Sequence, residues 1–235
     1  MINSLFKIYF CFTLGLCFAS KNLPSYSLTD SKGRPLDHKL VEVLNRKNGF
    51  FIEVGAYDGV CQSNTLLLEQ HFNWKGLLIE ANPYLIESIK KNRPTSIAYS
   101  CALGNFDQNY TYVYGDFQNQ GLMCSIDGVR LNTTPLTKVS IRSLQSILDE
   151  LHVHHIDLFS LDTEGYEYNI LQGIDFDKTT FDYFLIEIYQ KDYDKIVHFL
   201  RERNYDLVEN FSGYNKVDNP RWDETHNDYL FKKGK

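Results

Sequence analysis

The fold of this chain is decided by Phe50-Phe51-Ile52-Glu53-Val54-Gly55-Ala56-Tyr57-Asp58-Gly59, an apolar run that breaks into a glycine-bearing turn. The β-branched and aromatic residues from Phe50 to Val54 are typical of a buried parallel strand. Gly55 and Gly59 allow the backbone to curl and to approach a ligand closely. The stretch therefore predicts a nucleotide-like ligand beside the turn that follows this strand.

The spacing of the glycines favours S-adenosylmethionine over NAD as that ligand. A dinucleotide-binding fingerprint has three closely spaced glycines, whereas here Asp58 lies between Gly55 and Gly59. A carboxylate in such a loop can face the ammonium group of the methionine moiety, but negative charge beside a pyrophosphate is of little use to NAD. We therefore expect Gly55, Ala56, Asp58 and Gly59 to bind the cofactor.

A second buried strand, Gly76-Leu77-Leu78-Ile79-Glu80, ends in an acid. Glu80 lies about twenty residues beyond the turn, a separation at which an acid at the tip of the second strand accepts hydrogen bonds from both ribose hydroxyls. Glu80 is therefore the predicted ribose ligand, with a solvated strand-end acid as the alternative. Helices are expected over residues 63–72 and 83–92, the second with Asn82 as its cap.

Strands and helices alternate along the rest of the chain. Ala102 and Leu103 lie in the turn that ends the third expected strand, where analogy with other βα folds suggests an adenine contact and a plain turn is the alternative. The polar segment over residues 117–134 is the expected place of a substrate-binding insertion. Further strands are expected over 96–104, 110–115, 139–141, 156–161, 183–189, 205–209 and 227–231, and further helices over 38–47, 144–151, 166–172 and 192–203. This order predicts a parallel sheet between two layers of helices, with an antiparallel edge hairpin.

A group of acids follows the strand over residues 156–161. In a doubly wound sheet the ligands bind at the carboxyl ends of the strands, so Asp162 and Glu164 are expected in the same crevice as Gly55 and Glu80. Such acids can serve as a general base for a hydroxyl, as ligands of a hard metal ion or as acceptors for substrate hydroxyls. We assign Asp162 and Glu164 as the candidate catalytic residues. The alternative is that Glu164 and Glu167 stabilise the first turn of the next helix.

The composition bounds the class of protein. With 235 residues, 43% hydrophobic and 23% charged, the chain can bury a substantial core and fits one globular domain with a short leader. The formal net charge is −6 and no block of Lys and Arg is present, which argues against nucleic acid as a partner. No CxxC or Cys/His spacing typical of a metal site occurs, and no metal ligand is assigned.

The N-terminus predicts a secretory route. An apolar stretch over residues 8–20 ends in small residues, which indicates a signal peptide; an uncleaved signal anchor is the alternative and the one case in which we expect contact with a membrane. Sequons at Asn109, Asn132 and Asn210 are compatible with a luminal or secreted protein. Cys61, Cys101 and Cys124 permit at most one disulfide outside the leader. We expect a leader over residues 1–20, a lead-in or linker over 21–37 and one domain over 38–235.

Taken in order, five motifs of this chain resemble those of the FkbM-type methyltransferases. They are residues 51–59, Ile79-Glu80-Ala81-Asn82-Pro83, Ala102-Leu103-Gly104, residues 161–171 and Ile186-Glu187. The resemblance implies a class I methyltransferase fold, which is a Rossmann-like, doubly wound α/β sheet, mostly parallel with an antiparallel edge strand. It also implies S-adenosylmethionine as the cofactor, with Glu53 among the cofactor-binding residues at a position where Asp is more usual.

Two hypotheses for the function follow from this resemblance. The first is an O-methyltransferase that acts on a hydroxyl of a glycan or another small acceptor in the secretory pathway, as the better understood members methylate sugar or polyketide hydroxyls. The second is a catalytically silent binding or trafficking protein, because some secretory-pathway members look like trafficking factors. The sequence leaves the oligomeric state open.

Overall fold

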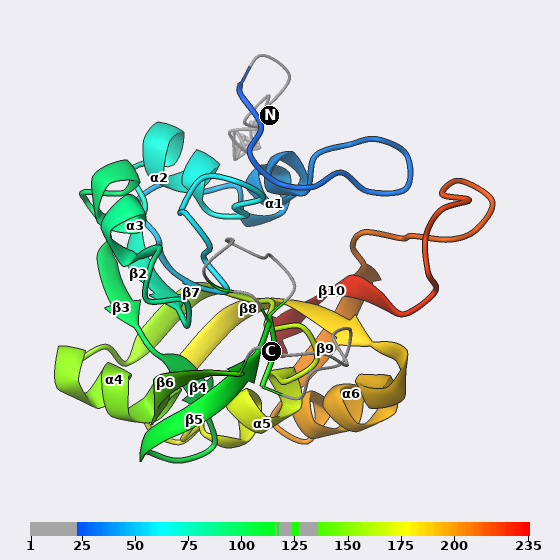
Figure 1. The fold of residues 1–235 in the computed structure, drawn as a ribbon. Helices are drawn as coiled ribbons and strands as arrows, with labels where there is room; N and C mark the ends of the chain where they lie inside the picture. Colours follow the sequence, from blue (N-terminus) through cyan, green and yellow to red (C-terminus); the bar gives the residue numbers. More distant parts are fainter. Residues whose placement is uncertain (1–22, 116, 118–123, 127–135) are drawn as a thin grey trace, which may run out of the picture.

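The centre of the molecule is a seven-stranded sheet, seen in a computed structural model that describes residues 23–115, 117, 124–126 and 136–235 (Figure 1). Its strands are, in spatial order, β3 (Ile97–Ser100), β2 (Lys75–Glu80), β1 (Phe50–Val54), β7 (His155–Leu161), β8 (Thr180–Tyr189), β10 (His226–Lys233) and β9 (Tyr205–Asn210). The first five are mutually parallel, whereas β10 is antiparallel to both β8 and β9. The predicted doubly wound sheet with an antiparallel edge is confirmed.

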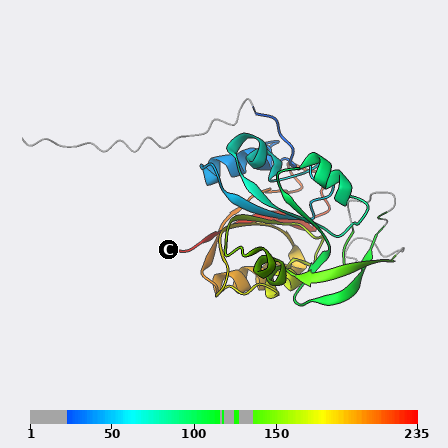
Figure 2. The ribbon, with the colours of Figure 1, turned by 90° about the vertical axis from the view of Figure 1, so that its left-hand side faces the viewer.

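Helices cover both faces of this sheet, as Figure 2 shows. One face carries α1 (Leu36–Leu44), α2 (Leu66–Phe72) and α3 (Ile86–Asn92), and the other carries α4 (Leu144–Leu151), α5 (Glu167–Gln172) and α6 (Tyr193–Arg201), which follows the short 3-10 helix η1 (Gln190–Asp192). Alternation along β1 accounts for the two cores, because Phe51 packs with α1 and α2 while Ile52 and Val54 pack with α4 and α5. Both sets of β1 side chains are buried, which explains the continuous apolar run in the sequence.

A second, three-stranded sheet lies at the end of the molecule where the chain leaves β3. It consists of β4 (Ala102–Gly104), β6 (Leu136–Ser143) and β5 (Gln108–Tyr114), in the order β4-β6-β5. The single strand expected over residues 96–104 is therefore wrong: Ser100 still pairs with Glu80, but Ala102 already pairs with Ile141 of β6. Most of the expected insertion over residues 117–134 lies outside the described residues.

Two helices begin later than the sequence predicts. The helix expected from residue 63 begins at Leu66, because Ser63 and Thr65 donate their hydroxyls to Glu53 instead, at 2.9 and 2.6 Å. The helix expected from residue 83 begins at Ile86. Asn82 accepts a hydrogen bond from the amide of Tyr84, so it caps the turn that precedes α3 rather than the helix itself.

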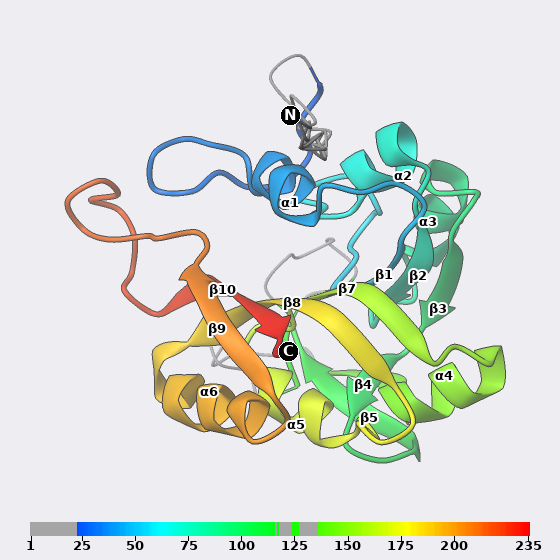
Figure 3. The same ribbon diagram turned by 180° about the vertical axis from the view of Figure 1, so that it is seen from behind.

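The described chain before α1 packs on the domain. The carboxylate of Asp37 accepts a hydrogen bond from the amide of Tyr26 at 2.7 Å. The hydroxyl of Tyr214, in the loop between β9 and β10, donates to the carbonyl of Thr29 at 2.8 Å, and Figure 3 shows these two segments side by side.

The leader expected over residues 1–20 lies outside the described residues. None of the helices in the described part has the length and apolar character that a membrane span requires. In the described part of the chain, Cys61 and Cys101 are free thiols.

Candidate functional site

A cleft opens at the carboxyl ends of β1, β2 and β7, with about 1090 Å³ of empty space that includes open solvent. Parallel strands bring these ends to one edge of the sheet, the usual place for ligands in α/β folds. Eight of the ten residues predicted for the site line this cleft: Glu53, Gly55, Ala56, Glu80, Ala102, Leu103, Asp162 and Glu164.

Gly55 brings the ends of β1 and β7 together. Its φ is +81°, and a Cβ placed on it would lie 2.0 Å from the carbonyl oxygen of Asp162. The amide of Asp162 in turn donates to the carbonyl of Val54 at 3.2 Å. Only glycine fits this position, because any side chain would collide with the backbone that carries Asp162.

Glu80 holds the turn that follows β1. One carboxylate oxygen accepts from the amide of Tyr57 at 2.7 Å and the other accepts from the amide of Asn82 at 2.7 Å. Burial raises the pKa of Glu80 to about 7, although these two amides act in the opposite direction. Each oxygen has a second lone pair, so the side chain can still accept a hydroxyl from the cleft. The solvated strand-end acid is therefore not what the structure shows.

Asp58 and Gly59 do not line the cleft. One oxygen of Asp58 accepts from the amides of Val60 and Cys61, both at 2.8 Å, which is the usual local role of Asp in a turn. Gly59, with a φ of +82°, lies against Arg93, and a Cβ there would be 2.9 Å from that side chain. Both residues therefore have a structural role in the turn, and their contact with a cofactor stays a prediction.

Glu53 lines the cleft, but its carboxylate already accepts hydrogen bonds from other residues of the chain. Besides Ser63 and Thr65, its carboxylate accepts from the amide of Asn64 at 2.7 Å and lies 3.6 Å from the guanidinium of Arg93. The Arg93 side chain is fully buried and also forms an ion pair with Glu69 at 2.6 Å. Glu53 therefore fixes the segment that enters α2, one wall of the cleft, through a buried network.

Asp162 and Glu164 lie where β7 ends. Glu164 has a φ of +58°, an uncommon backbone conformation for a residue other than glycine, and its carboxylate accepts the hydroxyl of Tyr189 at 2.6 Å. Asp162 opens onto the cleft. Desolvation and the neighbouring carboxylates, above all that of Glu164, raise the pKa of Asp162 well above its usual range. A carboxylate in this state is a stronger base than an ordinary aspartate.

Of Glu164 and Glu167, for which the sequence offers a structural role in the next helix as the alternative, Glu167 takes that role. It is the first residue of α5, and one of its oxygens accepts from the amides of Thr163 and Gly165 at 2.8 and 3.1 Å. This hydrogen-bonding orders the loop that carries Asp162 and Glu164, which leaves both side chains directed to other contacts.

Two further acids lie near the cleft: for Glu187 the sequence leaves open whether it faces the cleft or pairs with a neighbouring helix, and for Asp228 it offers no signal. Glu187 on β8 and Asp228 on β10 are buried and lie directly opposite each other, and His226 contacts Glu187 at 3.1 Å. The position of β10 beside β8 brings these residues together. The acid near the end of residues 183–189 is the only sequence signal for this group of acids. The sequence of the last strand does not show which strand it will pair with.

Comparison with known proteins identifies the family through one family model. A family model described as the methyltransferase FkbM domain matches residues 53–207. An FkbM methyltransferase from Methylobacillus flagellatus is 13% identical, with a TM-score of 0.48, and the match covers 78% of this chain and 43% of that one. A TehB-like SAM-dependent methyltransferase from Corynebacterium glutamicum is 10% identical, with a TM-score of 0.43 and coverage of 86% and 91%. The fibrillarin pre-rRNA processing protein of Methanococcus jannaschii is 12% identical, with a TM-score of 0.47 and coverage of 81% and 69%. The comparison with curated proteins gave no match.

Proposed function

Because this chain belongs to the FkbM methyltransferase family, we propose that it transfers the methyl group of S-adenosylmethionine to a hydroxyl of a glycan or another small acceptor. The family match and the strand order confirm the class I methyltransferase fold expected from the sequence. One observation carries the proposal: the Gly55 turn, the acid of β2 and the acids after β7 line a single cleft.

The cofactor side of the cleft fits an adenosine with a charged amino-acid tail. Ile79, Ala102 and Leu103 supply an apolar wall of the kind that holds an adenine, and Glu80 supplies the acceptor for ribose hydroxyls. The backbone at Gly55 leaves room for a close approach. When bound, S-adenosylmethionine supplies an electrophilic methyl group on a sulfonium.

The chain's own task is to orient the acceptor oxygen and to remove its proton. Asp162 and Glu164 are the candidate bases, since both line the cleft at the end of β7. Asp162 opens onto the cleft, and the hydroxyl of Tyr189 fixes the orientation of Glu164. Asp162 and Glu164 are not needed to bind the ribose, because Glu80 is the acceptor for its hydroxyls.

The acceptor class and the location rest on the sequence. The apolar leader and the three sequons support entry into the secretory pathway, where glycans are abundant hydroxyl acceptors. Asn109 and Asn210, the two sequons among the described residues, are exposed. We therefore place the protein in the lumen of the endoplasmic reticulum or Golgi or outside the cell, or anchored there through residues 8–20 if the leader stays.

The test separates binding from transfer. Asp162→Asn and Glu164→Gln are expected to keep S-adenosylmethionine affinity in titration calorimetry and to lose transfer by about 10²–10⁴-fold if the residue is the base. Transfer is measured in a single turnover from labelled cofactor to a mixed glycan pool, with Glu87→Gln on the exposed surface of α3 as the control.

If both variants transfer the methyl group at the rate of the parent chain, Asp162 and Glu164 have a structural role and are not the base. A parent chain that binds the cofactor but transfers to no acceptor would favour the silent binding protein instead.

A further inference from the structure

Three carboxylates converge beside the cleft, from three different elements. Asp162 follows β7, Glu167 begins α5 and Glu187 lies near the end of β8, and one oxygen of each lies within 4.8 Å of the others. Of the three, Asp162 lines the cleft, while Glu167 and Glu187 are 1% and 7% exposed.

Both buried glutamates have one oxygen occupied and one without a partner. In Glu167 the occupied oxygen accepts from Thr163 and Gly165, and in Glu187 it contacts His226 at 3.1 Å. The second oxygen of each is buried and makes no hydrogen bond. Buried carboxylate oxygens are rarely left in this state, because they lose their hydration without compensation. The occupied oxygens hold both side chains in place, so the second oxygens stay buried without a partner.

Carboxylates crowd around these oxygens, and the basic side chain that contacts them is His226, at Glu187. Asp228 lies directly across from Glu187 on the neighbouring strand, a placement that costs stability when both are ionised. In the described part of the chain, no Lys or Arg forms an ion pair with Asp162, Glu167 or Glu187. Either bound protons or a bound cation must offset this charge.

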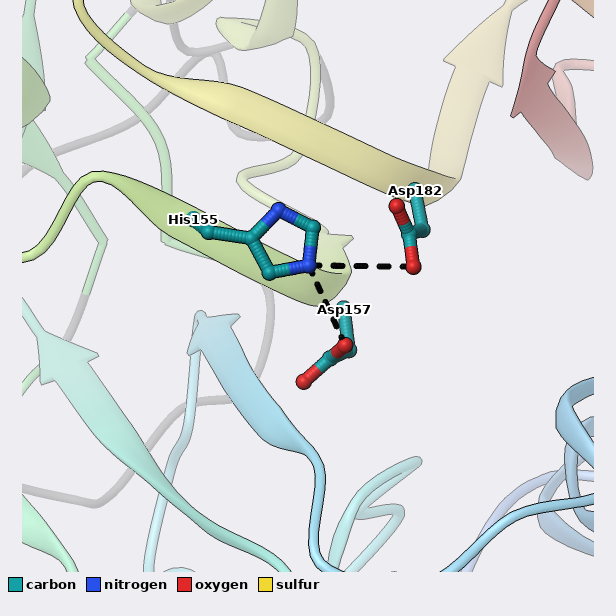
Figure 4. A group of neighbouring side chains, drawn as sticks. All are labelled: His155, Asp157 and Asp182. Carbon is teal, nitrogen blue, oxygen red and sulfur yellow. Dashed lines mark hydrogen bonds and ion pairs between the residues drawn. The ribbon is translucent and has the colours of Figure 1, made fainter. Parts of the chain in front are cut away.

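A second acidic group of this chain shows what an internally compensated cluster looks like. His155, Asp157 and Asp182 also lie close together, as Figure 4 shows. Here Arg46 forms ion pairs with both aspartates, the second at 2.9 Å. These residues lie at the beginnings of β7 and β8, the edge of the sheet away from the cleft. Among the described residues, Arg46 supplies a permanent cation at that edge, whereas the basic partner of the Asp162, Glu167 and Glu187 group is His226, which is charged only when protonated.

We propose that Asp162, Glu167 and Glu187 bind one hard divalent cation, such as Mg²⁺, Mn²⁺ or Ca²⁺, beside the cleft. An all-oxygen set of carboxylates selects this class of ion over softer metals. Two oxygens bound to such an ion at about 2.0–2.6 Å lie at most about 5 Å apart, which matches the grouping of these ligands. Since Asp162 also lines the cleft, the ion would lie close to an acceptor hydroxyl there. The role toward the acceptor rests on the proposed function, whereas the binding of the cation does not.

The test uses the full-length chain, stripped with EDTA and then titrated with MnCl₂ while free Mn²⁺ is followed by electron paramagnetic resonance. The parent chain is expected to bind one Mn²⁺, which Mg²⁺ or Ca²⁺ displaces. Glu187→Gln and Glu167→Gln are expected to weaken this binding by at least about 10-fold. Asp182→Asn, in the Arg46 cluster, is the matched control and is expected to bind as the parent does.

Thermal melting supplies a second readout. Mn²⁺ is expected to raise the melting temperature of the parent and of Asp182→Asn but not of Glu187→Gln, because a ligand stabilises only a chain that binds it. Without metal, Glu187→Gln should melt no lower than the parent, since it removes a like charge beside Asp228. If Glu187→Gln impairs folding, Asp162→Asn serves as the site variant in its place.

Two results would overturn the cation site: no Mn²⁺ bound by the parent at millimolar concentration, or equal affinity in the parent and the site variants. Calorimetry with S-adenosylmethionine in EDTA runs in parallel and needs no cation. Loss of that binding would count against the proposed function and leave the cation site standing.

Discussion

Glu80 is the residue through which the cofactor side of the cleft is most directly tested. We expect Glu80→Ala to weaken S-adenosylmethionine binding by about 1–3 kcal/mol, the scale for the loss of hydrogen bonds to a charged group. Titration calorimetry on the purified chain measures the change. Unaltered affinity would remove the ribose assignment.

The pKa of Glu80 adds a control to this measurement. Because burial raises it to about 7, the side chain is largely protonated below that pH. Hydroxyl donors bind more strongly to the ionised carboxylate, so cofactor affinity should rise as the pH increases from 6 to 8. This rise in cofactor affinity with pH is expected to be absent in Glu80→Ala.

Gly55 is the second critical residue of the site. Gly55→Ala is expected to unfold at clearly lower urea concentration and to lose the cofactor, because the new Cβ would meet the carbonyl of Asp162 at 2.0 Å. Gly33 is the matched control: its φ is +78°, yet nothing lies within 4 Å of its Cβ position. Gly33→Ala should therefore cost only the left-handed backbone strain, about 1–2 kcal/mol, with cofactor affinity unchanged. Equal losses in the two variants would contradict the steric argument.

Residue types and spacing predict eight residues that line the cleft, but not what each side chain contacts. Gly55, Glu80 and Asp162 follow from the rule that ligands gather at the carboxyl ends of parallel strands. Asp58 shows the limit, because an aspartate in a turn bonds its own backbone as readily as a ligand. Glu53 was attributed to the cofactor by resemblance, and only the structure reveals its partners Ser63, Thr65 and Arg93.

At the scale of the element, α3 is connected to the cleft by one buried cation. Arg93 follows the last turn of α3 and pairs with Glu53 and Glu69. We expect Arg93→Ala to lower the free energy of unfolding by about 3–5 kcal/mol, because it leaves two buried carboxylates without their partner. Lys90→Ala is the control on the same helix. Its ion pair with Glu87 is exposed, and its loss should cost no more than about 0.5 kcal/mol. Urea unfolding that shows similar losses for both would refute the network.

The sequence predicts which segments form strands, but it predicts only in part which strands pair with one another. Parallel pairing of β1, β2 and β7 is implied by the alternation of strands and helices. The insertion of β10 between β8 and β9 is not, because either order satisfies the same apolar pattern. That one placement brings His226 and Asp228 beside Glu187, so the acidic group is a product of topology.

The division of the chain between two sheets limits prediction at the scale of the whole molecule. The run over residues 96–104 has uniform strand character, yet its two halves pair with β2 and β6 in different sheets. Pairing partners far along the chain decide this, and local propensity carries no information about them. Ala102 and Leu103 still line the cleft, together with Cys101, which lies between the two strands.

The route of the whole protein through the cell gives the last prediction. In a eukaryotic secretory host we expect entry into the lumen and glycans at one or more of Asn109, Asn132 and Asn210. Asn109 is exposed on β5, so its sequon stays accessible after folding. In the sequon of Asn210, Phe211 and Ser212 are fully buried, so modification there must precede the pairing of β9 with β10.

A mobility shift after glycosidase treatment measures the glycan, and Thr111→Ala removes the Asn109 sequon without touching the cleft. A chain that lacks residues 1–20 is the control for entry and should remain unmodified. If the full chain stays wholly in the cytosol, the leader is not a secretory signal. If it enters the lumen without any shift, the leader stands and the sequons are unused, because occupancy depends on the access of each Asn and not on the signal.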